Sequence, residues 1–129
     1  MALERDRTTR SYLYGRLLAI ADHLEGAALS KAGESRDTNA ARFMQRFSDA
    51  PYTTWLVIEK SLDPYRRRLQ ASAPGLLHRF SKELEEVMNA FSSDQFTDNR
   101  KLEGEFLLAY HCQRSALWEK VSEETPATV

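Results

Sequence analysis

Apolar residues recur at intervals of three and four along almost the whole chain, and no convincing stretch alternates with period two. This spacing places apolar side chains on one face of a helix, whereas a half-buried strand needs alternation. The chain is therefore predicted to be all-α and to form a single compact bundle of about five helices. A length of 129 residues suits one such domain. The first apolar stripe, which follows a candidate N-cap at Thr8 or Thr9, comprises Leu13, Leu17, Ile20, Leu24 and Ala28.

Loop signals separate this stripe from two further helices. Residues 31–37, around Gly33, are polar and predict a loop. Pro51 suits the first turn of the third helix. The second helix is predicted to be short, with a cap at Asp37, Thr38 or Asn39 and an apolar face of Ala40, Phe43, Met44 and Phe47.

The third stripe runs straight through a proline. Pro64 predicts a kink or a restart, because a proline inside a helix removes a hydrogen bond and clashes with the preceding turn. Asp63 is the candidate cap of the second piece. The two pieces still share one apolar face, made of Trp55, Ile58, Leu62, Tyr65 and Leu69.

The C-terminal half predicts two more helices. A turn at residues 73–75 precedes the fourth, whose apolar face is Leu77, Phe80, Leu84, Val87, Met88 and Phe91 and whose outer face is Lys82, Glu83, Glu85 and Glu86. Residues 92–97 predict a polar loop. The fifth helix is expected from near Asp98 to about Glu119, with an inner side of Leu102, Phe106, Ala109, Gln113 and Leu117. We expect the bundle to span residues 1–121 and residues 122–129 to form a frayed tail.

Charge is segregated along the chain, although the formal net charge is only −1. Residues 36–82 carry nine basic and four acidic side chains, whereas residues 83–129 carry four basic and ten acidic ones. Thirteen of the eighteen basic residues are arginine, which forms two-pronged contacts with phosphate and stacks on bases. A solvated helix face is the ordinary explanation of such a segment. Its concentration of arginine with few acids favours a nucleic-acid contact at Arg42, Arg46, Lys60, Arg66, Arg67 and Arg68.

The sequence offers no candidate for catalysis, a cofactor or a metal ion. Cys112 is the only cysteine, and its neighbour His111 would point about 100° away on a helix, so the two cannot act as nucleophile and base. His23 and His78 lack ligand partners at helical spacing, and no glycine-rich loop could hold phosphate. We therefore expect a non-enzymatic, cytoplasmic protein without a membrane span. A helix-turn-helix repressor is less favoured, because no helix is rich in base-reading side chains.

The outer face of the fifth predicted helix carries apolar residues among polar ones. They lie at helical spacing, away from the stripe that contains Phe106 and Ala109. This pattern indicates either a partner surface or a helix buried on both sides. The candidate subunit contacts on this face are Leu107, His111, Arg114 and Trp118.

Two short motifs and their order resemble a known family. Residues 104–114, Gly-Glu-Phe-Leu-Leu-Ala-Tyr-His-Cys-Gln-Arg, are similar to a G-x-F-x-x-G-Y-x-H-Q-R pattern near the C-terminus of the type I-C CRISPR Cascade large subunit. Ala109 stands where glycine is usual, and Cys112 interrupts the His-Gln pair. Residues 14–20, Tyr-Gly-Arg-Leu-Leu-Ala-Ile, resemble the L-G-R-L-F-A-V opening of the same region, and Asn39-Ala40 followed by Pro51 agrees in order. The resemblance covers about residues 12–118.

In that family the C-terminal helical region also exists as a separate small subunit, read from an internal start, and a 129-residue chain with its own Met1 fits that product. The resemblance implies contacts with the Cascade backbone and large subunits, another copy of itself, guide RNA and the single-stranded non-target DNA. Tyr110, His111, Gln113 and Arg114 would serve packing and subunit contact. The alternative is an all-helical protein-interaction module without nucleic-acid contact.

Overall fold

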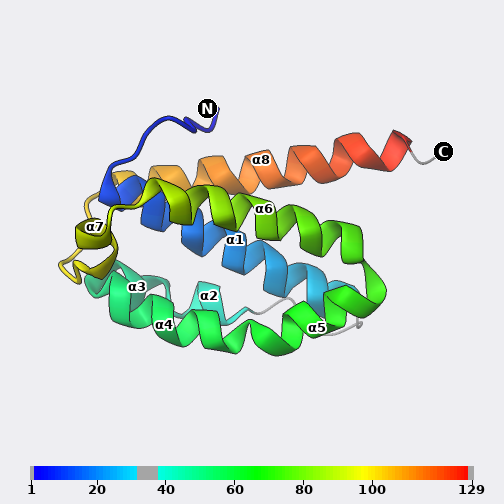
Figure 1. Ribbon diagram of the computed structural model, residues 1–129, viewed down its shortest axis with the longest axis horizontal. Coiled ribbons are helices and arrows are strands. Elements are labelled where there is room, and N and C mark those ends of the chain that lie inside the picture. The colour runs from blue at the N-terminus through cyan, green and yellow to red at the C-terminus, as the bar shows by residue number, and fades with distance from the viewer. Residues whose placement is uncertain (1, 32–37, 128–129) are drawn as a thin grey trace.

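The computed structural model is an all-helical bundle, as predicted (Figure 1). It describes the backbone of residues 2–31 and 38–127 and the side chains of residues 2–30 and 38–117. Within these ranges the chain forms eight helices and no strand, against the five or so helices expected. The three additional helices arise because two predicted helices are divided and one predicted loop is helical.

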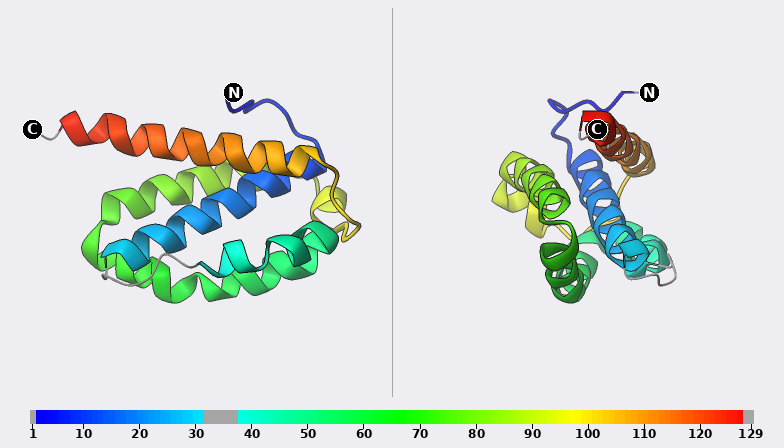
Figure 2. Two further views of the ribbon diagram at one scale, coloured as in Figure 1. Left: turned by 180° about the vertical axis from the view of Figure 1, so that it is seen from behind. Right: turned by 90° about the vertical axis from the view of Figure 1, so that its right-hand side faces the viewer.

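Helix α1 (Arg10–Lys31) is the centre of the bundle. It packs against α8 on one side and against α5, α6 and α2 on the others (Figure 2). The predicted stripe from Leu13 to Ala28 is buried, but so is every side chain from Ser11 to Ala21. A helix enclosed on all sides has no exposed face to carry charge, which explains why this run is apolar or small apart from Ser11 and Arg16.

Two short helices, α2 (Asn39–Arg42) and α3 (Met44–Asp49), replace the single one expected, with a break at Phe43. Of the three candidate caps, Thr38 is the N-cap, and its hydroxyl accepts a hydrogen bond from the Ala41 amide at 3.0 Å. The buried Glu25 carboxylate of α1 accepts hydrogen bonds from the backbone amides of Asn39 and Ala40, at 2.9 and 3.2 Å. The start of α2 is therefore tied to the central helix. The predicted loop at 31–37 lies outside the described residues, apart from the backbone of Lys31.

The interruption expected at Pro64 occurs between α4 (Pro51–Ser61) and α5 (Asp63–Ser72). The cap assignment was wrong: Leu62 occupies the N-cap position without a side-chain hydrogen bond, and Asp63 is the first residue of α5. Since Leu62 keeps right-handed helical angles, the helical phase continues with little change and its side chain stays buried. Burial of the shared stripe therefore outweighs the benefit of a polar cap.

Three further predictions about the C-terminal half need correction. In α6 (Pro74–Ala90) Glu83 is buried rather than on the outer face. Residues 93–97 form α7 (Ser93–Thr97), because Ser92 and Gln95 make reciprocal capping bonds. Helix α8 (Glu105–Ala127) starts later than Asp98 and ends later than Glu119. The predicted inner side, from Leu102 to Leu117, is buried. The division of the chain at residue 121 stays a prediction.

Candidate nucleic-acid interface

The positively charged segment forms one layer of the bundle. Helices α2 to α5 lie below α1 in the view of Figure 1, and α8 lies above it, although Phe47 of α3 reaches Phe106 of α8 with ring centres 5.7 Å apart (Figures 1 and 2). We call this layer, with its six candidate side chains, the cationic layer. Five of these side chains are exposed and Arg66 is half-buried; the six are Arg42, Arg46, Lys60, Arg66, Arg67 and Arg68.

Three of the six follow one line along the layer. Arg46 of α3 borders a groove that Val57 of α4 lines from the other side. Lys60 lies one helical turn after Val57, and Arg67 lies two turns after Lys60 on the continuous phase of α4 and α5. Within the described part of the chain, Arg46, Lys60 and Arg67 form no ion pair with a carboxylate. Their charge is directed at solvent.

The other three cations have neighbours within the chain. Arg66 forms an ion pair with Asp63 at 3.1 Å, Arg68 lies over the Tyr65 ring at 5.7 Å, and Arg42 lies near the Glu25 carboxylate. The six side chains thus do not point in one direction, as expected for the consecutive arginines at 66–68. The line from Arg46 to Arg67 is the part of the layer best placed to contact a ligand.

Arginines on the opposite side of the bundle are paired with carboxylates. Arg5 bonds Glu83 at 3.1 Å and Glu86 at 2.7 Å, and Arg7 bonds Glu105 at 2.6 Å. These cations anchor the N-terminal segment to α6 and α8. They add no net positive surface, because each is offset by an acidic neighbour.

The most enclosed arginine, Arg16, was not singled out from the sequence. It is 0% exposed, donates to Gln113 at 2.6 Å, also bonds Glu86, and lies 3.6 Å from Glu83. We call Arg5, Arg16, Glu83, Glu86 and Gln113 the buried ion-pair network, which joins the N-terminal segment, α1, α6 and α8. Burial alone would raise the pKa of Glu86, but the hydrogen bond and charge of Arg16, with those of Arg5, outweigh it and hold that pKa below its usual value. A basic residue inside an apolar stripe was the one sequence signal that could have revealed this network.

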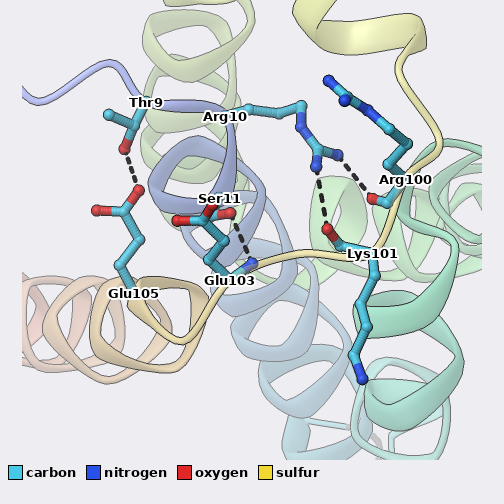
Figure 3. A pocket seen from close by; sticks show the side chains of 7 residues that line it. All are labelled: Thr9, Arg10, Ser11, Arg100, Lys101, Glu103 and Glu105. Carbon is cyan, nitrogen blue, oxygen red and sulfur yellow. Dashed lines mark hydrogen bonds between the residues drawn. The ribbon is translucent and has the colours of Figure 1, made fainter.

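A second, polar hollow of about 390 Å³ lies at the start of α1, beside the loop before α8 (Figure 3). Arg10 donates to the carbonyls of Arg100 and Lys101 at 2.9 and 3.1 Å. Thr9 donates to Glu105, and the Ser11 hydroxyl accepts from an amide of the same loop. The polar groups of this hollow mainly attach the loop to α1, and its charges are mixed.

The two motifs noted in the sequence pack against each other. An added Cβ on Gly15 would collide with the Phe106 carbonyl oxygen and would lie 2.8 Å from the Ala109 Cβ, so α1 and α8 approach very closely here. One residue further along, Arg16 bonds Gln113. The motifs are therefore the two halves of one helix–helix contact, and this contact accounts for the small residues within both.

Residues 1–118 match the sequence profile of a family described as CRISPR-associated protein (Cas_Csd1). The chain belongs to this family. A comparison with curated proteins returns no match. The expected CRISPR association is confirmed, and both motifs lie inside the region that matches the Cas_Csd1 family.

The predicted contact face of α8 is partly exposed in this Cas_Csd1 family member. Leu107 is 48% exposed and His111 is exposed, whereas Gln113 is buried, in agreement with its predicted packing role. Arg114 lies 3.6 Å from Asp22 and 5.5 Å from the centre of the Tyr110 ring. Burial and the Asp22 carboxylate raise the pKa of Tyr110 to about 12.

The side chain of Trp118 lies outside the described part. Leu107, His111 and Arg114 share one face of α8 by their helical spacing.

The described residues of this family member offer no grouping of side chains that is typical of a metal site. No three histidine, cysteine or acidic side chains there are grouped so that they could hold a metal ion. Cys112 is buried and free, while its neighbour His111 is exposed, so the two side chains point apart. No helix in the described ranges is long and apolar enough to cross a membrane.

Proposed function

We propose that this chain is the non-catalytic small subunit of a type I-C RNA-guided surveillance complex. Its cationic layer would contact the phosphates of the guide–target duplex and of the displaced non-target strand. The family membership supports a role in a CRISPR system. The observation that carries the proposal is the line of exposed cations without carboxylate partners among the described residues, namely Arg46, Lys60 and Arg67.

The concentration of unpaired positive charge in one layer favours a ligand with phosphates. Arg5, Arg7, Arg10, Arg16 and Arg100 each have an acidic partner in the same chain. The cationic layer has few acids although the chain as a whole has one more acidic than basic residue. Like charges spaced along one layer repel one another, and a polyanion removes that repulsion.

Such a layer would bind nucleic acid with little sequence preference. Phosphate contacts fix position and orientation but carry no sequence information. In RNA-guided complexes the guide supplies specificity by base pairing, and the protein supplies a positive track for the backbone. The absence of a base-reading helix from the sequence agrees with this division of labour.

The exposed face of α8 would contact protein. Leu107 with His111 and Arg114 gives α8 an exposed apolar group surrounded by polar ones, which is typical of a subunit contact. We propose the backbone and large subunits, together with a second copy of the chain, as the partners of this face. The bundle would then bridge nucleic acid and protein through two different faces.

Charge reversal in the assembled complex tests the proposal. The variant Arg46→Glu/Arg67→Glu should assemble normally but open target DNA more slowly and give weaker interference. A matched control, Arg100→Glu/Lys101→Glu, changes the net charge equally at exposed positions outside the layer and should behave like wild type. Normal target-strand unwinding by the first variant would contradict the proposal.

The second candidate function is a module that binds only protein. It is favoured by the exposure of large apolar side chains within the cationic layer itself, Leu56 at 42% and Val57 at 51%. In that case the exposed arginines would pair with acids of a partner, and reversal of Arg46 and Arg67 would block assembly rather than DNA opening. Purification of the mutant complex separates the two outcomes.

A further inference from the structure

We infer that the groove between α3 and α4 takes an unpaired base of the displaced DNA strand. This inference rests on the proposed function and adds a specific site to it. The groove encloses about 180 Å³ and contains no acidic side chain; its lining residues are Phe43, Arg46, Ala50, Thr53, Thr54 and Val57.

An aromatic ring and a guanidinium group lie together at one wall. The Arg46 guanidinium carbon lies 5.2 Å from the centre of the Phe43 ring. This contact holds the guanidinium against the ring and restricts its rotation. A guanidinium plane fixed in this way offers a stacking surface to a base, and its charge is available to the adjoining phosphate.

The α4 side of the groove presents one exposed apolar side chain. Val57 lines the groove with 51% of its surface exposed, and its neighbour Leu56 is 42% exposed. Exposure of a large apolar side chain to water is unfavourable, and the flat face of an unpaired base could cover Val57, whereas Leu56 points about 100° away and does not line the groove. A base pair in a duplex has both faces stacked already, so the groove suits single-stranded nucleic acid.

The polar groups of the groove are used within the chain. The Thr54 hydroxyl donates to the Arg46 carbonyl oxygen at 3.2 Å, and the Thr53 amide donates to Asn99 at 3.1 Å. These groups are therefore not directed at the edge of a base. The site would accept any base by stacking, as a sequence-independent strand contact requires.

Cations continue from the groove along the same face. Lys60 lies one turn beyond Val57, about 4.5 Å along the helix axis, and Arg67 follows on α5. A strand whose base enters the groove would then run its backbone past both side chains. Charge complementarity thus selects a polyanion over an apolar peptide as the occupant.

Oligonucleotides with and without bases test the inference. The full chain is titrated with oligothymidylate and with an abasic strand of the same length, over a range of salt concentrations. Wild type should bind oligothymidylate about fivefold or more tightly than the abasic strand. Arg46→Lys keeps the charge but removes the guanidinium plane, so it should lose this preference while keeping the salt dependence. Val57→Ser should lose the preference too.

The matched control is Leu56→Ser, which changes a neighbouring exposed apolar side chain that does not line the groove and should keep the preference. Photo-crosslinking with 5-iodouracil DNA should label α3 or α4. Salt-dependent binding with equal affinity for both strands would overturn this inference and leave the proposed function intact. No binding of either strand by the chain and by the assembled complex would overturn both.

Discussion

The arginines on the two sides of the central helix share one chemistry but have opposite surroundings. On the α6 and α8 side, Arg16 is fully buried and Arg5 bonds two carboxylates, so these charges are neutralised and help join four segments. In the cationic layer, Arg46 and Arg67 are exposed and form no ion pair with a described carboxylate.

This difference teaches that residue type alone does not mark a binding surface. Breaking a buried ion pair leaves an uncompensated charge in the interior, so such arginines are required for folding. An exposed cation adds little to stability, so its replacement should leave the fold intact. Stability and nucleic-acid binding should therefore respond to different substitutions, one set in the buried ion-pair network and the other in the cationic layer.

The largest expected effect is the loss of the buried arginine. Arg16→Ala removes the partner of Glu83 and Gln113, which are 5% and 0% exposed, and should lower the free energy of unfolding by about 3 kcal/mol. Urea denaturation measures the change. Arg100→Ala is the control, because Arg100 is also salt-bridged but is 84% exposed, and it should cost less than about 1 kcal/mol. Similar losses in both variants would remove the distinction between the two kinds of arginine.

The next effect concerns the contact between α1 and α8. Gly15→Ala should destabilise the protein by about 2 kcal/mol, because the new Cβ meets the Phe106 backbone, which cannot move aside as a flexible side chain could. Gly26→Ala is the matched control on the same helix, since nothing lies within 4 Å of an added Cβ there. That variant should be neutral or slightly more stable. Thermal unfolding of both proteins checks the prediction, and an unchanged Gly15 variant would contradict the close approach.

A smaller effect is expected on acidification. The pKa of Glu86 is lowered in the folded state, so its contribution to stability is present above the ordinary value of 4.5 and is lost as the pH falls through the folded value. Glu86→Gln should therefore be less stable than wild type at pH 7, and the difference should shrink below pH 4.5. Urea midpoints measured across this range give the comparison. A difference independent of pH would show that the carboxylate charge does not contribute.

Features of the fold that depend on a local sequence pattern could be predicted, whereas features that depend on a tertiary contact could not. Helical spacing was sufficient for the fold class and for the buried stripes of α1 and α8. It failed at Glu83, because its burial depends on Arg5 and Gln113, which are distant in the sequence. It also failed at Asp63, where continuous packing of Leu62 prevailed over capping chemistry.

The candidate site was likewise predictable only in part. Charge clustering identified the segment that forms the cationic layer. The groove could not be predicted, because Phe43, Arg46 and Val57 come from two helices whose packing the sequence pattern does not specify. The motifs of residues 14–20 and 104–114 were recognised, but their mutual contact appeared only in three dimensions.

The smallest expected effect on stability is in the cationic layer. Replacing Arg46, Lys60 and Arg67 by glutamine should change the free energy of unfolding by less than about 0.5 kcal/mol at each position. These side chains are exposed and have no acidic partner in the described residues. Urea denaturation of the triple variant checks this. A large loss would mean that the layer is part of the scaffold rather than a surface kept for a ligand.

The salt dependence of single-stranded DNA binding by the assembled complex tests the central claim most directly. Each phosphate contact contributes a slope of about −0.7 to the plot of log affinity against log salt concentration. We expect the glutamine variant of Arg46, Lys60 and Arg67 to bind more weakly and with a shallower slope, and Arg100→Gln/Lys101→Gln to leave the slope unchanged. An unchanged slope in the triple variant would contradict the assignment of the cationic layer to nucleic acid.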